Sequence, residues 1–492
     1  MSQFRDSSIL LLANLIGKMF RFGRQMVLAY FLGVAANVDM LLVAQIVPMI
    51  ILATLGGGGG EVLVTMIRKS EIKDSLVSAF MGLLIAFVCL IGLAAYILFP
   101  RVVAFYEITP EAVTTFSILS ALFFANLIPG VIVSVSIPLV YLQNKYWQYA
   151  VAIISSEFLA LVAIISLVDT YGIIAFPIGT LCGSIINMFL FVRILRLKPK
   201  ILSIPQRLWS NREDIGQLLR RLFYVSGQTI VFHLAAFWDR SLSIKFLEPG
   251  YLSRLNYSQT VFELPKTIFQ KSIGTTTYIR QIQHTSDADG KYRQYTEKMT
   301  RFLFATVGIA QLFFVFACPM LLILLYRRGK FGNDEVVSTL VIMEILALSL
   351  FPAIMDAFLS RSLYAQQEFR IVFWSILSRV LLKLVLMFSL INALPHVVPI
   401  STVVGLYFGY FFSQGLAARK GLARFFTLGQ MSWMVAILIL GIAMAILNGN
   451  ILDFYLGQTW YILAFLLISV TAFLGVLTGL YLKKTGHLKA LA

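Results

Sequence analysis

The sequence predicts an all-helical protein that crosses a membrane many times. Of its 492 residues, 59% are hydrophobic and only 13% are charged, whereas soluble chains average about 25% charged residues. Long apolar segments recur along the whole chain, and positive charge gathers between them, as in cytoplasmic loops of membrane proteins. The net charge of +17 therefore reflects membrane topology, and a nucleic-acid partner is not expected.

About fourteen segments have the length and apolar character of a membrane span. They lie near residues 8–32, 37–67, 76–99, 112–142, 147–168, 171–195, 222–247, 251–279, 301–325, 337–360, 371–392, 397–417, 430–447 and 459–482. The second and fourth are long and interrupted by Gly or Pro, so they are expected to bend. The glycine run at 56–60 predicts a bend, a hinge or close helix packing. It lacks the Lys and Ser/Thr of a phosphate-binding loop.

The loop charges predict the orientation of the chain. Basic loops occur near residues 68–73, 193–221, 280–298, 419–424 and 483–489, and the opposite side holds mainly Arg101, Arg327, Arg328 and Lys330. The positive-inside rule then places both termini in the cytoplasm. The segment 205–222 suits either a helix at the membrane surface or a plain basic linker.

The cysteines do not suggest a disulfide or metal site, and the N-terminal segment does not resemble a cleavable signal peptide. Cys89, Cys182 and Cys318 all lie in apolar segments, so neither a disulfide framework nor a metal site is expected. The first span is long and interrupted by polar residues, which is not the pattern of a cleavable signal peptide.

An internal repeat divides the chain. The polar segment 17–48 is matched by 237–265, if one residue is inserted before the second glycine. The matched pairs are Arg24 with Arg240, Gly33 with Gly250, Asp39 with Asn256, and Pro48 with Pro265. Both copies start from the cytoplasmic side, so we interpret them as a parallel duplication, with chance similarity of apolar segments as the alternative. Such repeats place a transport site where the two halves meet. The predicted divisions are 1–196, a linker at 197–221, 222–417, and 418–492.

Charged residues inside the predicted spans indicate the chemistry of that site. They are Lys18, Arg21, Arg24, Asp239, Arg240, Lys245, Arg254, Glu263, Lys266, Lys271, Arg379 and Lys383. Charges at membrane depth are costly and usually face a bundle interior or a wet cavity. A mainly cationic cavity suits an anion such as phosphate or pyrophosphate.

Simpler interpretations exist for some of these charges. Lys245 and Lys271 are near span ends and are expected to reach toward the membrane surface. Asp239 beside Arg240, and Glu263 three residues before Lys266, are alternatively internal ion pairs without a ligand. Lys18 and Arg24 have no acid nearby in their own helix, so they are the strongest candidates for lining a substrate path.

The polar segments also carry a family resemblance. Residues 17–25 read GKMFRFGRQ and are followed by Gly33, Asp39 and Pro48; further matching segments are 256–265 (NYSQTVFELP), 326–331 (YRRGKF) and 363–367 (LYAQQ). This pattern resembles the MurJ/MviN family of lipid II flippases, within the MOP superfamily of multidrug, oligosaccharidyl-lipid and polysaccharide exporters. Several family positions differ: Lys18 and Leu52 replace arginines, Gln25 replaces an aspartate, Thr260 replaces another arginine, and an acidic–Gly step falls within the glycine run.

The resemblance implies two pseudo-symmetric six-helix lobes around a central cavity, with two C-terminal helices outside them. It implies a flippase of the bacterial cytoplasmic (inner) membrane that moves an undecaprenyl-pyrophosphate-linked glycan by alternating access. Lys18, Arg24, Arg240 and Lys266 would bind pyrophosphate, while Asp39, Asp239 and Glu263 would pair with these cations and contribute to gating.

The resemblance implies no cofactor; the membrane potential or a cation gradient would drive transport. Arg379 and Lys383 argue against a sodium site in the eleventh span. Expected partners are the lipid-linked glycan, membrane lipids, and cell-wall or polysaccharide synthesis enzymes.

Other function classes remain as alternatives. The altered arginines favour an exopolysaccharide or O-antigen-type flippase. A MATE-like drug/cation antiporter is disfavoured because its cavity should be acidic or aromatic. A membrane scaffold would tolerate neutral residues at positions 18 and 24. An enzyme is not expected, because the chain lacks a cluster of acids or metal ligands.

Overall fold

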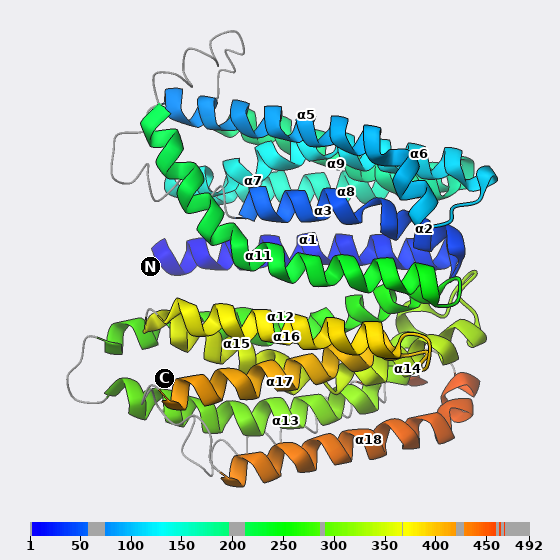
Figure 1. Ribbon diagram of the computed structural model, residues 1–492, viewed down its shortest axis with the longest axis vertical. Helices are drawn as coiled ribbons and strands as arrows, with labels where there is room; N and C mark the ends of the chain where they lie inside the picture. The colour runs from blue at the N-terminus through cyan, green and yellow to red at the C-terminus, as the bar shows by residue number, and fades with distance from the viewer. Residues whose placement is uncertain are drawn as a thin grey trace. The chain divides into compact units, whose positions relative to one another are not determined.

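The computed structural model describes residues 2–57, 74–195, 212–285, 291–366, 368–419 and 428–458, with residues 462, 463 and 467. All regular elements of these residues are helices, as the sequence predicts (Figure 1). They are α1 (Ser2–Leu32), α2 (Ala36–Ala44), α3 (Ile46–Leu52), the π-helical turn η1 (Ala53–Gly57), α5 (Asp74–Phe105), α6 (Pro110–Ala125), α7 (Leu127–Leu142), α8 (Tyr146–Tyr171), the 3₁₀ turn η2 (Gly172–Ile174), α9 (Ala175–Leu195), α11 (Arg212–Phe246), α12 (Tyr251–Thr285), α13 (Lys291–Tyr326), α14 (Asn333–Ala347), α15 (Leu350–Ala365), α16 (Phe369–Leu390), α17 (Val397–Arg419) and α18 (Leu428–Gly457).

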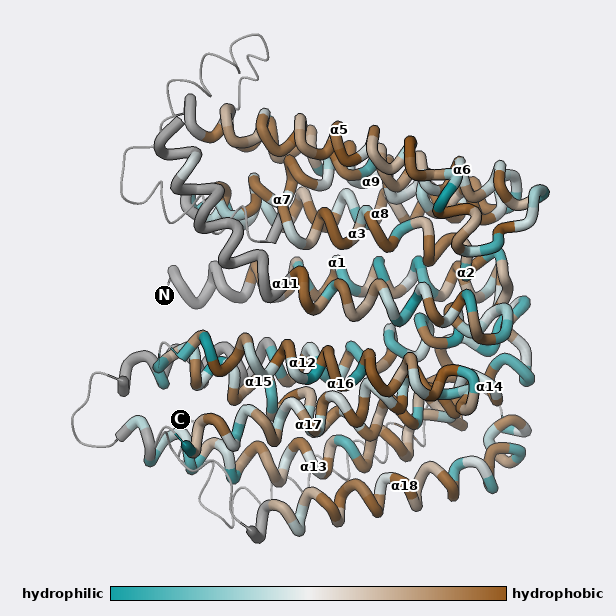
Figure 2. The backbone as a smooth tube through the Cα atoms, viewed as in Figure 1, coloured by the Kyte–Doolittle hydropathy of each residue, from teal (hydrophilic) through white to brown (hydrophobic). Residues whose placement is uncertain are grey.

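Many of these helices have the length and hydrophobicity of membrane spans. Within the described residues, nine stretches are long and apolar enough to cross a membrane. The helices α1, α11 and α12 have 31, 35 and 35 residues but are not among the nine. They carry most of the in-span charges, whereas Figure 2 shows that α5 is mainly hydrophobic. The last predicted span, 459–482, lies almost wholly outside the described residues, so the count of fourteen stays a prediction.

Prolines interrupt three of the spans. Because proline lacks an N–H and its ring clashes with the carbonyl four residues earlier, a helix tends to end just before it. The helix α2 ends at Ala44 before Pro48, and α6 ends at Ala125 before Pro129. These interruptions confirm the irregularity predicted for the second and fourth spans. A third break, between α14 and α15 before Pro352, was not predicted. Within the glycine run, Gly56 and Gly57 belong to η1, and 58–60 lie outside the described residues.

The chain divides by its internal contacts into two compact units, Met1–Leu252 and Ser253–Ala492. The helix α11 packs against α2, α3 and α5, so it belongs to the first unit. The predicted divisions at 196 and 222 followed the sequence repeat instead, and they stay predictions. Residues 205–211 of the proposed surface helix lie outside the described residues, and residues 212–222 begin α11.

Close packing of α8 with α1 and α9 shapes the interior of the first unit. A Cβ atom at Gly183 of α9 would lie 2.8 Å from the carbonyl oxygen of Ser156 on α8. A Cβ at Gly17 of α1 would lie 3.1 Å from Ile153. Small residues allow helices in a membrane to approach closely. They bring polar side chains of three helices within reach of one another.

Candidate functional site

Two arginines of α1 share one carboxylate from α8. The Nε of Arg21 donates to Oε1 of Glu157 at 2.5 Å, and a terminal nitrogen of Arg24 donates to Oε2 at 2.7 Å. The side chains of Arg24 and Glu157 are only 17% and 14% exposed. One carboxylate neutralises one of the two guanidinium groups, so the trio carries net positive charge. Lys18 lies one turn before Arg21 and is half-buried.

A polar cavity adjoins this trio. It has a volume of about 90 Å³ and is lined by Arg24, Ser156, Glu157, Ala160, Thr180, Gly183, Ser184 and Asn187, from α1, α8 and α9. A water molecule occupies about 30 Å³ in the liquid, so the cavity has room for a few waters but not for a glycan. The buried Oδ1 of Asn187 has no hydrogen-bond partner among the described residues. The cavity therefore offers solvation to Arg24 and Glu157 when their contact changes.

Asp39, in the first polar hairpin (α1 and α2), contacts the turn between α11 and α12. Its carboxylate, only 2% exposed, accepts a hydrogen bond from the backbone N–H of Gly250 at 2.7 Å. The φ angle of Gly250 is +87°, and a Cβ there would lie 2.7 Å from a methyl of Val34. Arg240 of α11 donates to the carbonyl of Leu42 on α2 at 3.4 Å. Asp39 and Arg240 thus hold the two repeated segments together.

The C-terminal end of α11 contacts the turn after α5. The hydroxyl groups of Tyr106 and Ser241 form a hydrogen bond at 2.7 Å, and burial raises the pKa of Tyr106. The Nζ of Lys245 lies 3.8 Å from a carboxylate oxygen of Glu107 and 4.8 Å from the ring centre of Phe105. Lys245 therefore has a structural role near the end of its helix, in agreement with its predicted position.

Lys266, Glu263 and Arg379 form ion pairs within the second unit. Lys266 donates to Glu263 within α12, and their side chains are 22% and 51% exposed. This is the ion pair that the three-residue spacing predicted as an alternative to a ligand site. Arg379 of α16 pairs with Asp356 of α15 at 2.8 Å, an acid that the sequence analysis did not single out.

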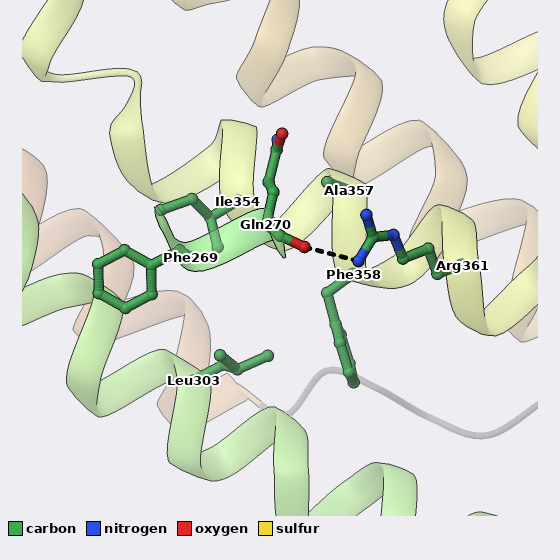
Figure 3. Close-up of a pocket in the computed structure, with 7 residues that line it drawn as sticks. All are labelled: Phe269, Gln270, Leu303, Ile354, Ala357, Phe358 and Arg361. Atoms are coloured by element: carbon green, nitrogen blue, oxygen red, sulfur yellow. Dashed lines mark hydrogen bonds between the residues drawn. The ribbon is translucent and has the colours of Figure 1, made fainter. Parts of the chain in front are cut away.

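A small apolar hollow lies between α12, α13 and α15 of the second unit (Figure 3). Its volume of about 10 Å³ holds at most one water. A terminal nitrogen of Arg361 donates to the carbonyl oxygen of Gln270 at 2.7 Å, drawn as a dashed line in Figure 3. This contact braces α15 against α12, and the hollow offers no room for a substrate.

The structure thus sorts the predicted site residues into separate groups. Arg24 lies beside the polar cavity, while Asp39 and Arg240 lie at the hairpin contact, where Asp239 is also buried. The most important residue that the sequence analysis missed is Glu157. Its signal was present, because it is the single acid in an otherwise apolar segment at 147–168. Within the described residues, no group of three His, Cys, Asp or Glu side chains could hold a metal. The side chain of Lys271 lies outside them.

The family follows from comparison with known proteins. A family model described as lipid II flippase MurJ matches residues 28–477, which is most of the chain. The chain belongs to the MurJ family. A relative from Aquifex aeolicus (strain VF5), described as a probable lipid II flippase MurJ, is 24% identical over 361 residues. This match covers 71% of the present chain and 69% of the relative.

Solved structures show the same fold. A lipid II flippase MurJ in an inward closed conformation has a TM-score of 0.76 and 17% identity, covering 98% of this chain and 99% of its own. An inward-facing multidrug resistance MATE family transporter of the MOP superfamily has a TM-score of 0.66 and 13% identity, covering 84% and 94%. As a member of the MurJ family, the chain is a multi-pass membrane protein and a transporter rather than an enzyme.

Proposed function

We propose that this chain flips lipid II, an undecaprenyl-pyrophosphate-linked glycan, across the bacterial cytoplasmic membrane by alternating access, with both termini in the cytoplasm. The observation that carries the proposal is the Arg21–Arg24–Glu157 trio, in which Arg24 and Glu157 are largely buried, beside a polar cavity in a chain of the MurJ family. Membership of the family supports the substrate, and the trio supports a way to bind it.

The trio suits reversible binding of a pyrophosphate. An arginine guanidinium binds carboxylate and phosphate oxygens with the same two-pronged geometry. A pyrophosphate carries more negative charge than the single carboxylate of Glu157, so it competes for Arg24. Release of Glu157 then leaves α1 without its ion pair to α8, and the polar cavity at Glu157 can hydrate the freed carboxylate. Substrate binding would thereby alter the packing of α1 and α8.

The remaining predicted residues have supporting roles in this proposal. Lys18 adds positive charge one turn from Arg21. Asp39 and Arg240 hold the hairpin contact, which changes as the transporter opens and closes. Lys266, with Glu263, contributes a further cation for the substrate. The membrane potential or a cation gradient drives the cycle.

A complementation experiment tests this function. The essential lipid II flippase of a bacterial host is depleted, and this chain is expressed with its membrane level measured. We expect growth to be rescued by the wild type and not by Arg24→Ala. Arg101→Ala removes an exposed cation of α5 in the same unit and serves as the matched control. Full rescue by Arg24→Ala at normal membrane levels would refute the proposed role of Arg24.

One observation favours a second candidate, a flippase for another polyprenyl-linked glycan. Leu52 occupies a position where the resemblance expects an arginine, and it packs on Gly130 and against the apolar cluster of α5 and α7. A methyl group of Leu52 lies 2.9 Å from where a Cβ of Gly130 would be, so the helices are fitted to an apolar residue there. If the well-inserted wild type fails to rescue, transport of an O-antigen or exopolysaccharide precursor becomes the next assay.

A further inference from the structure

A further buried carboxyl group, that of Glu344, lies between α14 and α18 of the second unit. The side chain of Glu344 is 7% exposed, although α14 and α18 are both in candidate membrane spans. Its Oε1 accepts a hydrogen bond from Nδ2 of Asn448 at 2.9 Å. Nδ2 also donates to the carbonyl of Val315 on α13 at 2.8 Å, and Asn448 is only 1% exposed. This acid–amide pair therefore joins three helices.

The hydrogen bonds of Asn448 indicate that the carboxyl carries a proton. Both groups that face its Nδ2 are acceptors, so the amide cannot be turned around without placing oxygen against oxygen. Its Oδ1 is consequently buried without a donor among the described residues. An ionised carboxylate has no donor to offer, whereas a protonated carboxyl of Glu344 has one. A protonated Glu344 would therefore bring a donor to this amide, which an ionised Glu344 cannot.

The surroundings of Glu344 offer no compensating positive charge. The thiol of Cys318 on α13 lies near Glu344 and donates to the carbonyl of Phe314. Tyr407 of α17 donates to the carbonyl of Leu348, which comes one turn after Glu344. Neither group is a cation, and α18 contributes the neutral Asn448. Within the described residues, no lysine or arginine forms an ion pair with Glu344. A buried carboxylate without a cation is strongly disfavoured in a membrane protein.

Close packing makes the pair sensitive to the position of α18. A Cβ at Gly308 of α13 would lie 2.3 Å from a methyl of Ile437, and a Cβ at Gly441 would lie 2.8 Å from a methyl of Leu348. The helix α18 therefore fits tightly against α13 and α14 at two glycines. Because Glu344 is only 7% exposed, hydration of its ionised form would require α18 to move away.

We propose that Glu344 is a proton-binding site, and that the protonated Glu344–Asn448 pair holds α18 against α13 and α14. Loss of the proton places an unpaired carboxylate between these helices and loosens α18. The site is separate from Arg24, so it does not depend on the identity of the transported lipid.

Infrared difference spectroscopy of the reconstituted full-length chain tests the proton directly. We expect a protonated-carboxyl band at about pH 7 that is absent in Glu344→Gln and present in Glu335→Gln. Glu335 is the matched control because it lies in the first turn of α14 and accepts from the N–H of Gly332. A wild-type spectrum without a band assignable to Glu344, even at about pH 5, would overturn the proposal.

Thermal unfolding tests the second half of the proposal. Glu344→Gln mimics the protonated acid, so the variant should fold. Its unfolding temperature should be nearly the same at about pH 6 and at about pH 9. Wild type and Glu335→Gln should lose stability over this range relative to Glu344→Gln, because the unfolded chain gives up the proton of Glu344 at a lower pH than the folded state does. Hydrogen exchange should report that loss first in α18. Equal pH dependence in wild type and Glu344→Gln would contradict the role of the proton in holding α18.

Discussion

The two copies of the polar hairpin have the same helix–glycine turn–helix backbone, but their charged side chains are paired differently. Gly33 and Gly250 both have positive φ angles, +65° and +87°, between consecutive helices. In the first copy, Arg24 of α1 is paired with Glu157 of another helix. In the second, the counterpart Arg240 of α11 donates to the backbone carbonyl of Leu42 on α2, and the acid Glu263 is paired with Lys266 of its own helix, one turn later. A pair within one helix survives any movement of that helix, whereas a pair between helices breaks when they separate.

The prolines of the two copies also differ in their effect on the helix. Pro48 follows an interruption between α2 and α3, while its counterpart Pro265 lies inside the continuous helix α12. The first copy therefore combines a broken helix with an ion pair between helices. The comparison assigns the responsive part of the first unit to α1, α2 and α8, and a more static role to the charges of α12.

The largest expected effect is at Glu157. Glu157→Ala leaves two arginines without their carboxylate, with Arg24 only 17% exposed. Removing one partner of a buried pair costs about 3 kcal/mol of unfolding free energy. Glu263→Ala is the matched control, because a partly exposed pair within a helix contributes about 0.5 kcal/mol or less. Chemical unfolding in detergent measures both values, and similar losses would remove the distinction between the two copies.

An intermediate effect is expected at Asp39. Asp39→Ala leaves the buried N–H of Gly250 without its acceptor, which costs about 2 kcal/mol. Asp39→Asn keeps an acceptor oxygen and introduces the residue found at the repeat position, Asn256, so its loss should be smaller. Thermal unfolding compares the two variants. If they are equally destabilised, the negative charge matters rather than the hydrogen bond.

A smaller effect is expected at the turn of the second copy. Gly250→Ala forces an alanine into a φ of +87° and against Val34, at a cost of about 1–2 kcal/mol. Gly92→Ala is the control, because it lies within α5 with nothing within 4 Å of the new Cβ. The control should be neutral or slightly stabilising. A Gly250→Ala protein as stable as Gly92→Ala would show that the turn relaxes without strain.

The sequence was sufficient to predict what depends on near neighbours along the chain. It predicted the helices and the irregular second and fourth spans, and it gave the pairing of Lys266 with Glu263 as an alternative to a ligand site, since spans, proline breaks and one-turn contacts are local. It did not predict that Glu157 meets Arg24 or that Asp39 meets Gly250. These partners are far apart in sequence, and only helix packing brings them together. Glu344 and Asn448 were missed for the same reason.

The central claim is that Arg24 transfers from Glu157 to the pyrophosphate of the substrate. A charge exchange, Arg24→Glu with Glu157→Arg, tests it by keeping the ion pair and moving the arginine to α8. The account predicts that the exchanged protein recovers most of the stability lost in Glu157→Ala but does not flip lipid II in proteoliposomes. Flipping at the wild-type rate by the exchanged protein would contradict the account, because the pair would then serve only to hold the helices together.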